Sequence, residues 1–330
     1  MEKKLTIVIL TYNRKERLLK QLHSIYNQKE SSDVLIEVVD NHSNYDVHDA
    51  ILQEFGADKT SNLQVSVNPV NYGMHGNLAL LFFHCATKWL WSLSDDDETE
   101  IDSIATILKD IEMYPDTAVF KYAMNTARNA KEDVEITSLP QLIDYYLDRH
   151  LGSGHLIFLS NNVFNMDYAM KYYGATLAHC YSCISQILPI FHILDEKAGT
   201  VRLRKKVLVN FKLPEPGSGY PYLYTAVEIS STNMFKFNLT NKYYNKLGFL
   251  VTNGFSHYKL AACALMFEDR KRGNFLYNQV YSRAYKNSGA IVDKLYHILY
   301  MFCYILHLQL PQKGAKNIRA LIRKIYPNFR

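Results

Sequence analysis

Short, unbroken apolar runs alternate with amphipathic stretches along the first hundred residues of the chain. Apolar runs cover residues 5–10, 34–39 and 89–93, and a shorter alternating run covers residues 63–67. Runs of this length are typical of strands that are covered on both faces of a sheet. Between them, apolar residues recur every three or four positions, which predicts helices. The repeated strand–helix order predicts a right-handed and mainly parallel α/β sheet.

The pattern continues more weakly after the first hundred residues. We expect a helix over residues 101–113 and a strand over residues 118–122 that extends the sheet. A strand over residues 155–159 and a helical stretch over residues 176–194, interrupted or kinked near Pro189, are expected next.

The last third of the chain reads differently. Residues 201–211 are strand-like, residues 213–221 form a loop with three prolines and two glycines, and the pattern beyond this loop is mostly helical. The expected division is an α/β domain over residues 1–220, with halves 1–125 and 126–220, and a helical C-terminal region over residues 221–330.

Polar clusters follow three of the predicted strands. Residues 11–14 follow the first strand, residues 40–44 the second, and four consecutive acids at 95–98 the fourth. Open α/β sheets bind their ligands at the carboxyl ends of their strands, so these clusters are the candidate site. We also expect Asn13 to cap the helix that follows the first strand.

The run of acids is compatible with two structures. Adjacent carboxylates repel one another, and a divalent cation bound to a diphosphate offsets that repulsion. The alternative is a helix start capped by Ser94 or Asp95, with acids in the first turn of the helix. The position of the run at the end of a buried strand favours the metal–diphosphate site.

The composition is that of a folded protein, with 48% apolar and 21% charged residues. Residues 294–330 carry seven Lys or Arg and no acid, whereas the rest of the chain is almost neutral. Nucleic-acid-binding domains spread their cations over a face of the fold, so we expect no nucleic-acid partner. The five scattered cysteines indicate reduced thiols, and the pair Cys180 and Cys183, without a second pair, does not predict zinc.

The tail has the pattern of a membrane-surface segment. We expect no signal peptide, and no apolar run reaches the ~18 residues of a spanning helix. Residues 295–310 are rich in apolar side chains, and basic and apolar residues alternate at helical spacing after Pro311. This pattern describes an interfacial helix on an anionic membrane. A terminal helix packed on the body, with its cations in solvent, is the alternative.

Five motifs, in their order and spacing, resemble those of the family 2 glycosyltransferases. The resemblance covers residues 4 to about 125 and implies a GT-A fold, with a mixed, mainly parallel sheet flanked by helices. The matching motifs are Ile7-Val8-Ile9-Leu10-Thr11-Tyr12-Asn13-Arg14, Gln28, Asp40-Asn41-His42-Ser43, Asn71-Tyr72-Gly73 followed by Asn77, and Asp95-Asp96-Asp97.

The resemblance also implies roles for individual residues. Mg²⁺ or Mn²⁺, held by members of the set Asp95, Asp96 and Asp97, would neutralise the diphosphate leaving group. Alignment on the strand end favours Asp96 as a ligand, whereas the literal Asp-x-Asp spacing favours Asp95 and Asp97. The residues that would hold the nucleotide are Thr11, Tyr12, Arg14, Asp40, Asn41, Asn71, Gly73, Asn77 and Asp95.

The chain departs from the family pattern at the catalytic base. Many members carry a Glu-Asp pair at the start of a later helix, and residues 150–190 contain no such pair. His179 stands near the expected start of that helix and would serve as the general base or as a further ligand near the diphosphate. A packed helix histidine is the alternative. We expect His179 and Asp97 to be the catalytic residues.

The sequence therefore predicts a glycosyltransferase of class EC 2.4. It would move a sugar from a nucleotide-sugar donor to a lipid-linked or growing surface glycan, such as an O-antigen or capsule, with metal assistance and inversion. The motifs are similar to those of a subgroup of transferases for bacterial surface polysaccharides. Ser160, Asn161 and residues 213–221 would line the acceptor side. The enzyme would be cytoplasmic and peripheral on the inner face of the cell membrane through residues 294–330.

Two other function classes remain compatible with the sequence. A nucleotidyltransferase acting on sugar phosphates also uses Mg²⁺ and acids at a strand end. Such enzymes usually carry a glycine-rich, basic loop after the first strand, and residues 11–14 are not such a loop. A catalytically inactive glycan-binding or scaffold member of the family would lack the Glu-Asp pair, as this chain does.

Overall fold

The chain divides into two compact units, which are described separately. The first consists of Met1–Cys180 and Ile184–Leu213, and the second of Tyr181–Cys183 and Pro214–Arg330. The computed structural model describes residues 2–126, 130–210, 237–239, 244–252, 263, 266–267, 274, 277–278 and 291–325. The expected loop over residues 213–221 and most of the expected helical pattern up to residue 290 lie outside the described residues.

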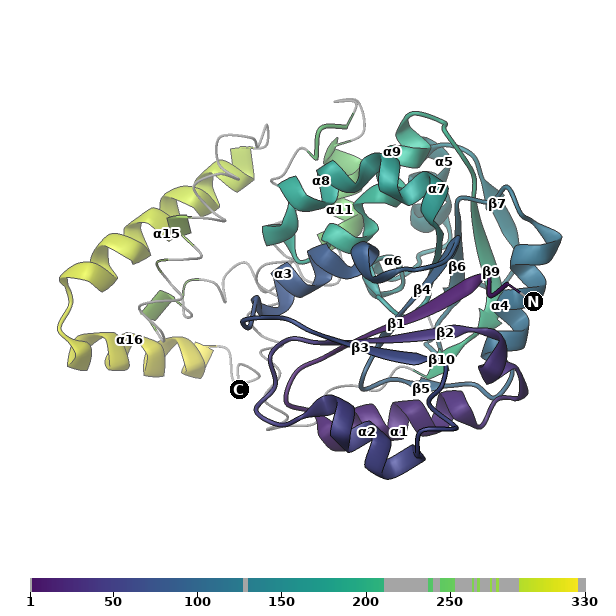
Figure 1. Ribbon diagram of the computed structural model, residues 1–330. Helices are drawn as coiled ribbons and strands as arrows, with labels where there is room; N and C mark the ends of the chain where they lie inside the picture. The colour runs from purple at the N-terminus through teal and green to yellow at the C-terminus, as the bar shows by residue number, and fades with distance from the viewer. Residues whose placement is uncertain are drawn as a thin grey trace. The chain divides into compact units, whose positions relative to one another are not determined.

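An eight-stranded sheet forms the centre of the first unit (Figure 1), with the strand order β3-β2-β1-β4-β8-β6-β9-β7. The four strands predicted in the first hundred residues lie side by side and are parallel. The strands of this sheet are β1 (Leu5–Thr11), β2 (Leu35–Asp40), β3 (Leu63–Val67), β4 (Trp89–Ser94), β6 (Val119–Ala123), β7 (Val134–Ile136), β8 (Asn162–Asn165) and β9 (Val201–Val207). The sheet is mixed and flanked by helices, as the sequence predicts.

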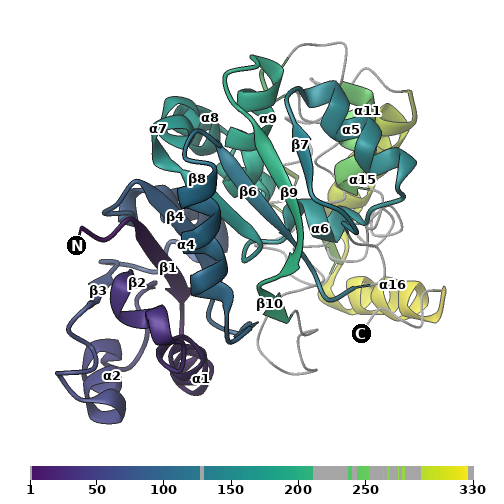
Figure 2. The same ribbon diagram turned by 90° about the vertical axis from the view of Figure 1, so that its right-hand side faces the viewer.

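Helices cover both faces of this sheet. Alternate residues of β1, such as Ile7 and Ile9, pack with α1, α2 and α4 into one apolar core, and Figure 2 shows α4 lying along the strands. A second helical layer, which includes α3, α8 and α9, lies on the other face (Figure 1). The helices are α1 (Lys15–Tyr26), α2 (Val47–Phe55), α3 (Gly73–Leu80), α4 (Ser103–Met113), α5 (Leu139–Asp148), α6 (Ser153–Ile157), α7 (Met166–Ala169), α8 (Tyr173–Ala178) and α9 (Leu188–Asp195).

The predicted strand over residues 155–159 is wrong. The chain there forms helix α6, closed by hydrogen bonds such as that from Phe158 N to Gly154 O at 2.9 Å. The strand begins only at Asn162, and it runs antiparallel between β4 and β6. The predicted strand over residues 118–122 therefore exists as β6 but does not pair with β4 directly.

The predicted helical stretch over residues 176–194 is interrupted, not kinked. Helix α8 ends at Ala178, and Cys183 adopts a positive φ of 60°, which a continuous helix does not allow. A new helix, α9, then begins at Leu188, with Pro189 in its first turn. Proline fits the first turn of a helix because its missing N–H has no partner there in any case, so Pro189 starts a helix instead of kinking one.

The expected helix cap at Asn13 is wrong, and the alternative structure of the acids, a helix start, is not formed. Asn13 has a positive φ of 54° and its Oδ1 accepts from Asn44 N at 2.7 Å, while Arg14 stands at the cap position of α1 without a side-chain capping bond. The acids at 95–97 form a turn that leads into the two-residue strand β5 (Glu98–Thr99), which pairs with β10 (Val209–Asn210). No helix starts at Ser94 or Asp95.

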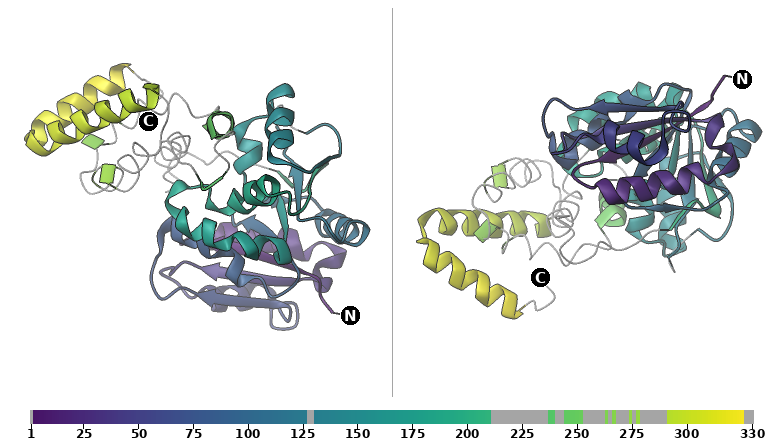
Figure 3. Two further views of the ribbon diagram at one scale, coloured as in Figure 1. Left: turned by 90° about the horizontal axis from the view of Figure 1, so that it is seen from above. Right: turned by 60° about the horizontal axis from the view of Figure 1, so that its bottom comes forward.

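The described part of the second unit is helical. It contains α11 (Tyr244–Thr252), α15 (Ile291–Gln309) and α16 (Gln312–Ile325). Figure 3 shows α15 and α16 as separate helices, joined through residues 310–311. Pro311 has no N–H to continue the helix, which agrees with the end of α15 at Gln309. Within the described ranges, none of the helices is both long enough and apolar enough to cross a bilayer.

Candidate active site

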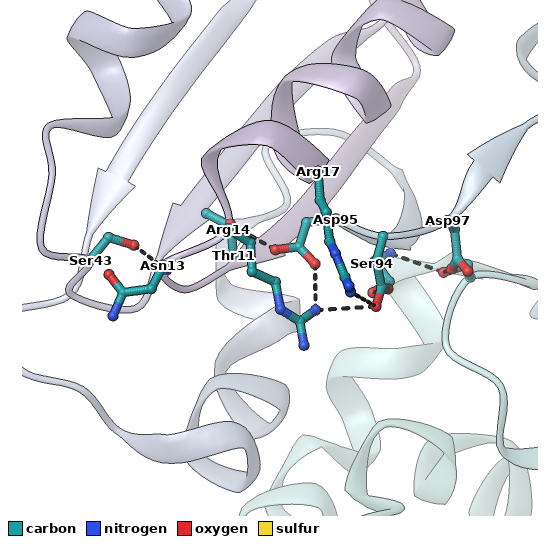
Figure 4. Close-up of polar contacts among 10 residues, drawn as sticks. Thr11, Asn13, Arg14, Arg17, Ser43, Ser94, Asp95 and Asp97 are labelled. Carbon is teal, nitrogen blue, oxygen red and sulfur yellow. Dashed lines mark hydrogen bonds and ion pairs between the residues drawn. The ribbon is translucent and has the colours of Figure 1, made fainter. Parts of the chain in front are cut away.

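The parallel register of three strands brings the polar clusters to one edge of the sheet. Thr11 pairs with Asp40 across β1 and β2, and Leu10 pairs with Ser94 across β1 and β4. The loops that follow these three strands therefore start at the same level. Figure 4 shows the side chains of these loops lying close together. The polar clusters thus lie together at the carboxyl ends of the strands.

Asp95 is enclosed by the loop and helix that follow the first strand. Its side chain is almost completely buried. Thr11 Oγ1 donates to Asp95 Oδ2 at 2.8 Å, and Arg14 Nη1 lies 2.8 Å from Asp95 Oδ1. Burial raises the pKa of the Asp95 carboxyl to about 6, although the Arg14 guanidinium acts in the opposite direction. Thr11, Arg14 and Asp95 are brought together as predicted.

Asp96 is the most exposed of the three aspartates, with 27% of its side chain accessible. Ser94 Oγ donates to Asp96 Oδ1 at 2.6 Å. Arg14 Nη1 and Arg17 Nη1 approach Asp96 Oδ2 at 3.3 and 3.4 Å. Arg14 lies at the cap position before α1 and Arg17 in the first turn of α1, and Figure 4 shows both side chains reaching the acids. The sequence analysis missed Arg17.

Asp97 lies on the other side of Ser94 and has a different environment (Figure 4). The Ser160 hydroxyl donates to Asp97 Oδ2 and also accepts from Ser94 N at 2.9 Å. Burial raises the pKa of the Asp97 carboxyl to about 7, against the effect of the Ser160 hydrogen bond. A carboxyl with this pKa exchanges a proton near neutral pH, which is a property of groups that transfer protons or bind cations.

The acids fit a divalent cation in chemistry, but they do not form a closed cage. Among the residues that the structure describes, no three acidic, histidine or cysteine side chains converge on one point. Asp95 and Asp96 share Arg14 as a partner, whereas Asp97 accepts from Ser160. Mg²⁺ commonly takes only one or two carboxylates together with phosphate oxygens, so a cation that bridges to a diphosphate needs no such cage.

Asp40 ties together the loops that follow the first two strands. Its Oδ1 accepts from Ser43 N at 2.9 Å, and Ser43 Oγ accepts from Asn13 N at 2.8 Å. Tyr12, in the first of these two loops, is 42% exposed. An aromatic side chain at this edge of the sheet is therefore open to solvent. A planar base stacks on such a ring.

Four of the predicted nucleotide residues form an amide network beside Asp40. Asn41 Nδ2 donates to Asn71 Oδ1 at 2.9 Å, and Asn71 Oδ1 also accepts from Gly73 N at 2.7 Å. Asn68 Nδ2 donates to both Asn41 Oδ1 and Asn77 Oδ1, at 3.0 and 3.1 Å. These amides bind one another, so the network shapes the loop over residues 68–73. Asn68 was not predicted.

Tyr45 is a further residue that the sequence analysis missed. Its hydroxyl is buried, and among the described residues it has no hydrogen-bond partner. Burial, together with the charges of Asp40 and Asp95, raises the pKa of Tyr45 to about 12. The hydroxyl therefore stays protonated near the two acids and has a hydrogen bond to give. No sequence pattern marks a lone tyrosine of this kind.

His179 lies at the carboxyl end of α8, not at the start of a long helix. Its backbone N donates to Ala175 O at 3.1 Å. Burial and the neighbouring His192 lower the pKa of His179 from its usual value. His192 in turn stacks on the ring of Tyr172, with ring centroids 5.7 Å apart. The neutral form of His179, which the lowered pKa favours, is the form in which a histidine accepts a proton.

Comparison with known proteins agrees with this architecture. Residues 6–161 match the model of the family described as glycosyl transferase family 2. No curated protein matches the chain.

Two solved structures are similar in fold. A mannosyltransferase of Pyrobaculum calidifontis, PcManGT, solved with GDP-Man and Mn²⁺, has a TM-score of 0.53 at 12% identity, over 92% of this chain and 87% of that one. Residues 1–349 of S. aureus TarS, solved with UDP-GlcNAc, have a TM-score of 0.52 at 14% identity, over 95% and 92% of the two chains. At these identities the likeness establishes the fold.

Proposed function

Through residues 6–161 this chain belongs to the family 2 glycosyltransferases, with a GT-A fold, and on that basis we propose how its site works. The enzyme moves a sugar from a nucleotide-sugar donor to a lipid-linked or growing surface glycan, such as an O-antigen or capsule. The similar folds solved with UDP-GlcNAc and with GDP-Man and Mn²⁺ support a donor of this class.

The nucleotide binds at the carboxyl ends of β1 and β2. Thr11, Tyr12 and Asp40 face this edge, and a carboxylate accepts hydrogen bonds from a base N–H or from ribose hydroxyls. The amide network around Asn41 holds the neighbouring loop in place. The protonated hydroxyl of Tyr45 adds a donor beside Asp40.

The diphosphate binds beside the acids at the end of β4. Mg²⁺ or Mn²⁺ would be held by Asp96 together with Asp95 or Asp97, and when bound it neutralises the charge that develops on the leaving nucleotide. Arg14 and Arg17 already supply positive charge at this position. Planar guanidinium groups bind phosphates in two-point contacts, so these arginines serve the same diphosphate.

The acceptor hydroxyl needs a base, and His179 is the residue we assign to this role. The lowered pKa of His179 keeps the imidazole neutral at physiological pH. Such an imidazole accepts the proton as the hydroxyl attacks, which leads to inversion at the sugar carbon. Asp97, whose pKa is about 7, is the second titratable group for this step.

The contact of Asp96 with both Arg14 and Arg17 is the observation that carries this function, because it joins an accessible carboxylate to two phosphate-binding cations. The test is incubation of the protein with Mn²⁺ and UDP-, GDP-, CDP- and dTDP-sugars, with hydrolysis of each donor followed by chromatography. We expect Mn²⁺-dependent hydrolysis of one donor class. Inertness toward every donor, with no metal-dependent nucleotide binding, would instead identify a scaffold member.

The acceptor is reached at an anionic membrane surface, to which α15 and α16 bind. Helix α15 has a buried face, which includes Tyr300 and Cys303, and an exposed apolar face. That exposed face consists of Ile291, Val292, Leu295, Ile298, Leu299, Met301, Phe302, Ile305 and Leu308. An apolar helical face inserts into the interface of a bilayer.

The charge of the following helix selects the membrane over a second copy of the chain. Residues 312–325 contain five Lys or Arg and no acid. A symmetric dimer through this region would bring two like-charged segments together, whereas anionic lipids attract each cation by about 1 kcal/mol. The enzyme therefore works as a peripheral protein on the inner, cytoplasmic face of the bacterial cell membrane.

A further inference from the structure

Lys121 is a buried basic residue in the core behind the candidate active site. It lies on β6 and is 0% exposed. Its Nζ donates to Asn161 Oδ1 at 3.0 Å and to Asn162 Oδ1 at 2.9 Å, so both acceptors are neutral amides. Burying an amino group without a carboxylate partner costs stability, and a methionine would fill the same space without that cost. Packing alone therefore does not account for Lys121.

The two asparagines are held from their other side as well. Asn161 Nδ2 donates to Tyr122 O at 3.1 Å and to His155 O at 3.0 Å. Asn162 Nδ2 donates to Phe158 O at 2.6 Å and to Leu159 O at 3.0 Å. Hydrogen bonds that hold the nitrogen of a side-chain amide also fix the direction in which its oxygen points. Lys121 thus completes a network that fixes the chain over residues 158–162.

Ser160 stands in the middle of this fixed segment. Its hydroxyl donates to Asp97 Oδ2 and accepts from Ser94 N at 2.9 Å, while its carbonyl accepts from Trp91 Nε1 at 2.9 Å. The segment is therefore bound to β4 through Ser160 and to β6 through Lys121. A shift of residues 159–162 would move the Ser160 hydroxyl away from Asp97.

We propose that Lys121 is a positioning residue for glycosyl transfer, which holds residues 159–162 so that Ser160 fixes the orientation of the Asp97 carboxylate. This inference rests on the proposed function in one respect, the role of Asp97 beside the cation and the diphosphate. Residues that orient a metal-binding carboxylate from behind typically contribute 10–100-fold to metal affinity.

The test is a double-mutant cycle on Mn²⁺ binding. Wild type, Lys121→Met, Ser160→Ala and the double variant are titrated with Mn²⁺ in an equimolar mixture of UDP, GDP, CDP and dTDP. Free Mn²⁺ is measured by electron paramagnetic resonance and compared with the same mixture without protein, because the nucleotides themselves bind Mn²⁺. We expect each single variant to bind Mn²⁺ about tenfold more weakly. The double variant should bind no more weakly than either single variant, because both changes break one chain of contacts.

Two further variants complete the experiment. Tyr122 is next to Lys121 on β6, and Tyr122→Phe removes the hydrogen bond from Tyr122 Oη to Asp110 Oδ2. This control variant should leave Mn²⁺ binding unchanged. Asn162→Ala removes one hydrogen-bond acceptor of Lys121. It takes the place of Lys121→Met in the double-mutant cycle if Lys121→Met does not fold, as judged by circular dichroism.

Each outcome decides a separate statement. If Lys121→Met binds Mn²⁺ as wild type does, or if the losses of the two single variants multiply, the positioning role is wrong and the proposed function stands. If wild type binds no Mn²⁺ in the nucleotide mixture, the proposed function itself is wrong. The positioning role of Lys121 is then wrong as well.

Discussion

Arg14 Nη1 lies 2.8 Å from Asp95 Oδ1, although the two residues are 81 positions apart in the sequence. The parallel pairing of β1 with β4 brings them together, because Arg14 follows the first of these strands and Asp95 the second. Asp95 is buried whereas the Arg14 side chain is 22% exposed. Arg14 is therefore the partner of this ion pair that is open to solvent.

Replacement of Arg14 should reduce stability more than replacement of Arg17. Arg14→Met removes the cation from a buried carboxylate, which we expect to cost about 1–3 kcal/mol of the free energy of unfolding. Arg17→Met removes only a 3.4 Å contact with the partly exposed Asp96 and should cost less than about 1 kcal/mol. Urea unfolding of both variants at pH 7 measures the difference. Equal losses in the two variants would show that the Arg14–Asp95 pair contributes no more to the free energy of unfolding than the Arg17–Asp96 contact.

Asp96→Ala should abolish Mn²⁺-dependent donor hydrolysis and leave the fold intact. Asp96 is the aspartate most open to solvent, so its removal should change the free energy of unfolding by less than about 1 kcal/mol. Hydrolysis of the accepted donor is measured with and without Mn²⁺. Asp102→Ala is the control, because Asp102 pairs with Lys206 at 2.7 Å. Activity of Asp96→Ala at the wild-type level would remove Asp96 from the cation site.

The sequence predicts the contacts around Asp95 better than those around Asp97. Thr11, Asp40 and Asp95 lie at the ends of buried apolar runs, and parallel strands align such ends without further information. Lys121 lies on β6, and no local sequence pattern predicts the antiparallel pairing of β6 with β8. Ser160 lies shortly before β8. The apolar residues 156–158 resemble a strand, but the hydrogen bonds of a short helix use their backbone instead. These contacts depend on the insertion of β8 between β4 and β6.

Stability should fall as the pH rises from 4 to 8, and Asp97→Asn should weaken this trend. Burial raises the pKa of Asp97 from 3.8 in the unfolded chain to about 7 in the folded one, so the folded state binds the proton more tightly. The stabilisation by the protonated Asp97 carboxyl is therefore complete below pH 3.8, and it is lost as the pH rises to about 7 and the carboxyl ionises. The effect is on the order of 3 kcal/mol. Urea unfolding with EDTA at pH 5 and pH 8 measures it.

The amide introduced by Asp97→Asn cannot ionise, yet its oxygen still accepts from Ser160, so this variant should be more stable than wild type at pH 8. Wild type and variant should approach equal stability at pH 5. A stability that increases between pH 5 and pH 8 by the same amount in both proteins would contradict the raised pKa of Asp97.

His179→Gln should reduce transfer to the acceptor by about 10²–10⁴-fold while donor binding is kept. The reason is that glutamine preserves a polar side chain but cannot take the proton of the attacking hydroxyl. The lowered pKa of His179 also predicts that wild-type transfer stays constant from pH 7 to pH 8 as far as this residue is concerned. Initial rates and the KM for the donor separate the two effects. A raised KM with unchanged kcat would make His179 a diphosphate ligand instead.

Substitutions on the exposed face of α15 should weaken binding to anionic vesicles. Phe302 and Ile298 are 58% and 51% exposed and lie four residues apart, on one side of the helix. Burial of one such side chain contributes about 1.5–3 kcal/mol, so Phe302→Ser should lower the vesicle binding constant at least tenfold. Cosedimentation with vesicles of phosphatidylcholine and phosphatidylglycerol over a series of lipid concentrations measures this constant. Ile101→Ser, a change at a 66% exposed position of the first unit, is the control.

The cations of α16 should make the same binding dependent on salt and on lipid charge. Lys313, Lys316 and Lys324 are exposed, and an ionic strength of 1 M screens charges beyond about 3 Å. Wild type should therefore bind phosphatidylglycerol vesicles at low salt, lose most of that binding at 1 M NaCl, and bind pure phosphatidylcholine weakly. If the protein does not bind vesicles, and sedimentation equilibrium shows a self-association that Phe302→Ser abolishes, the exposed face of α15 is a subunit interface instead.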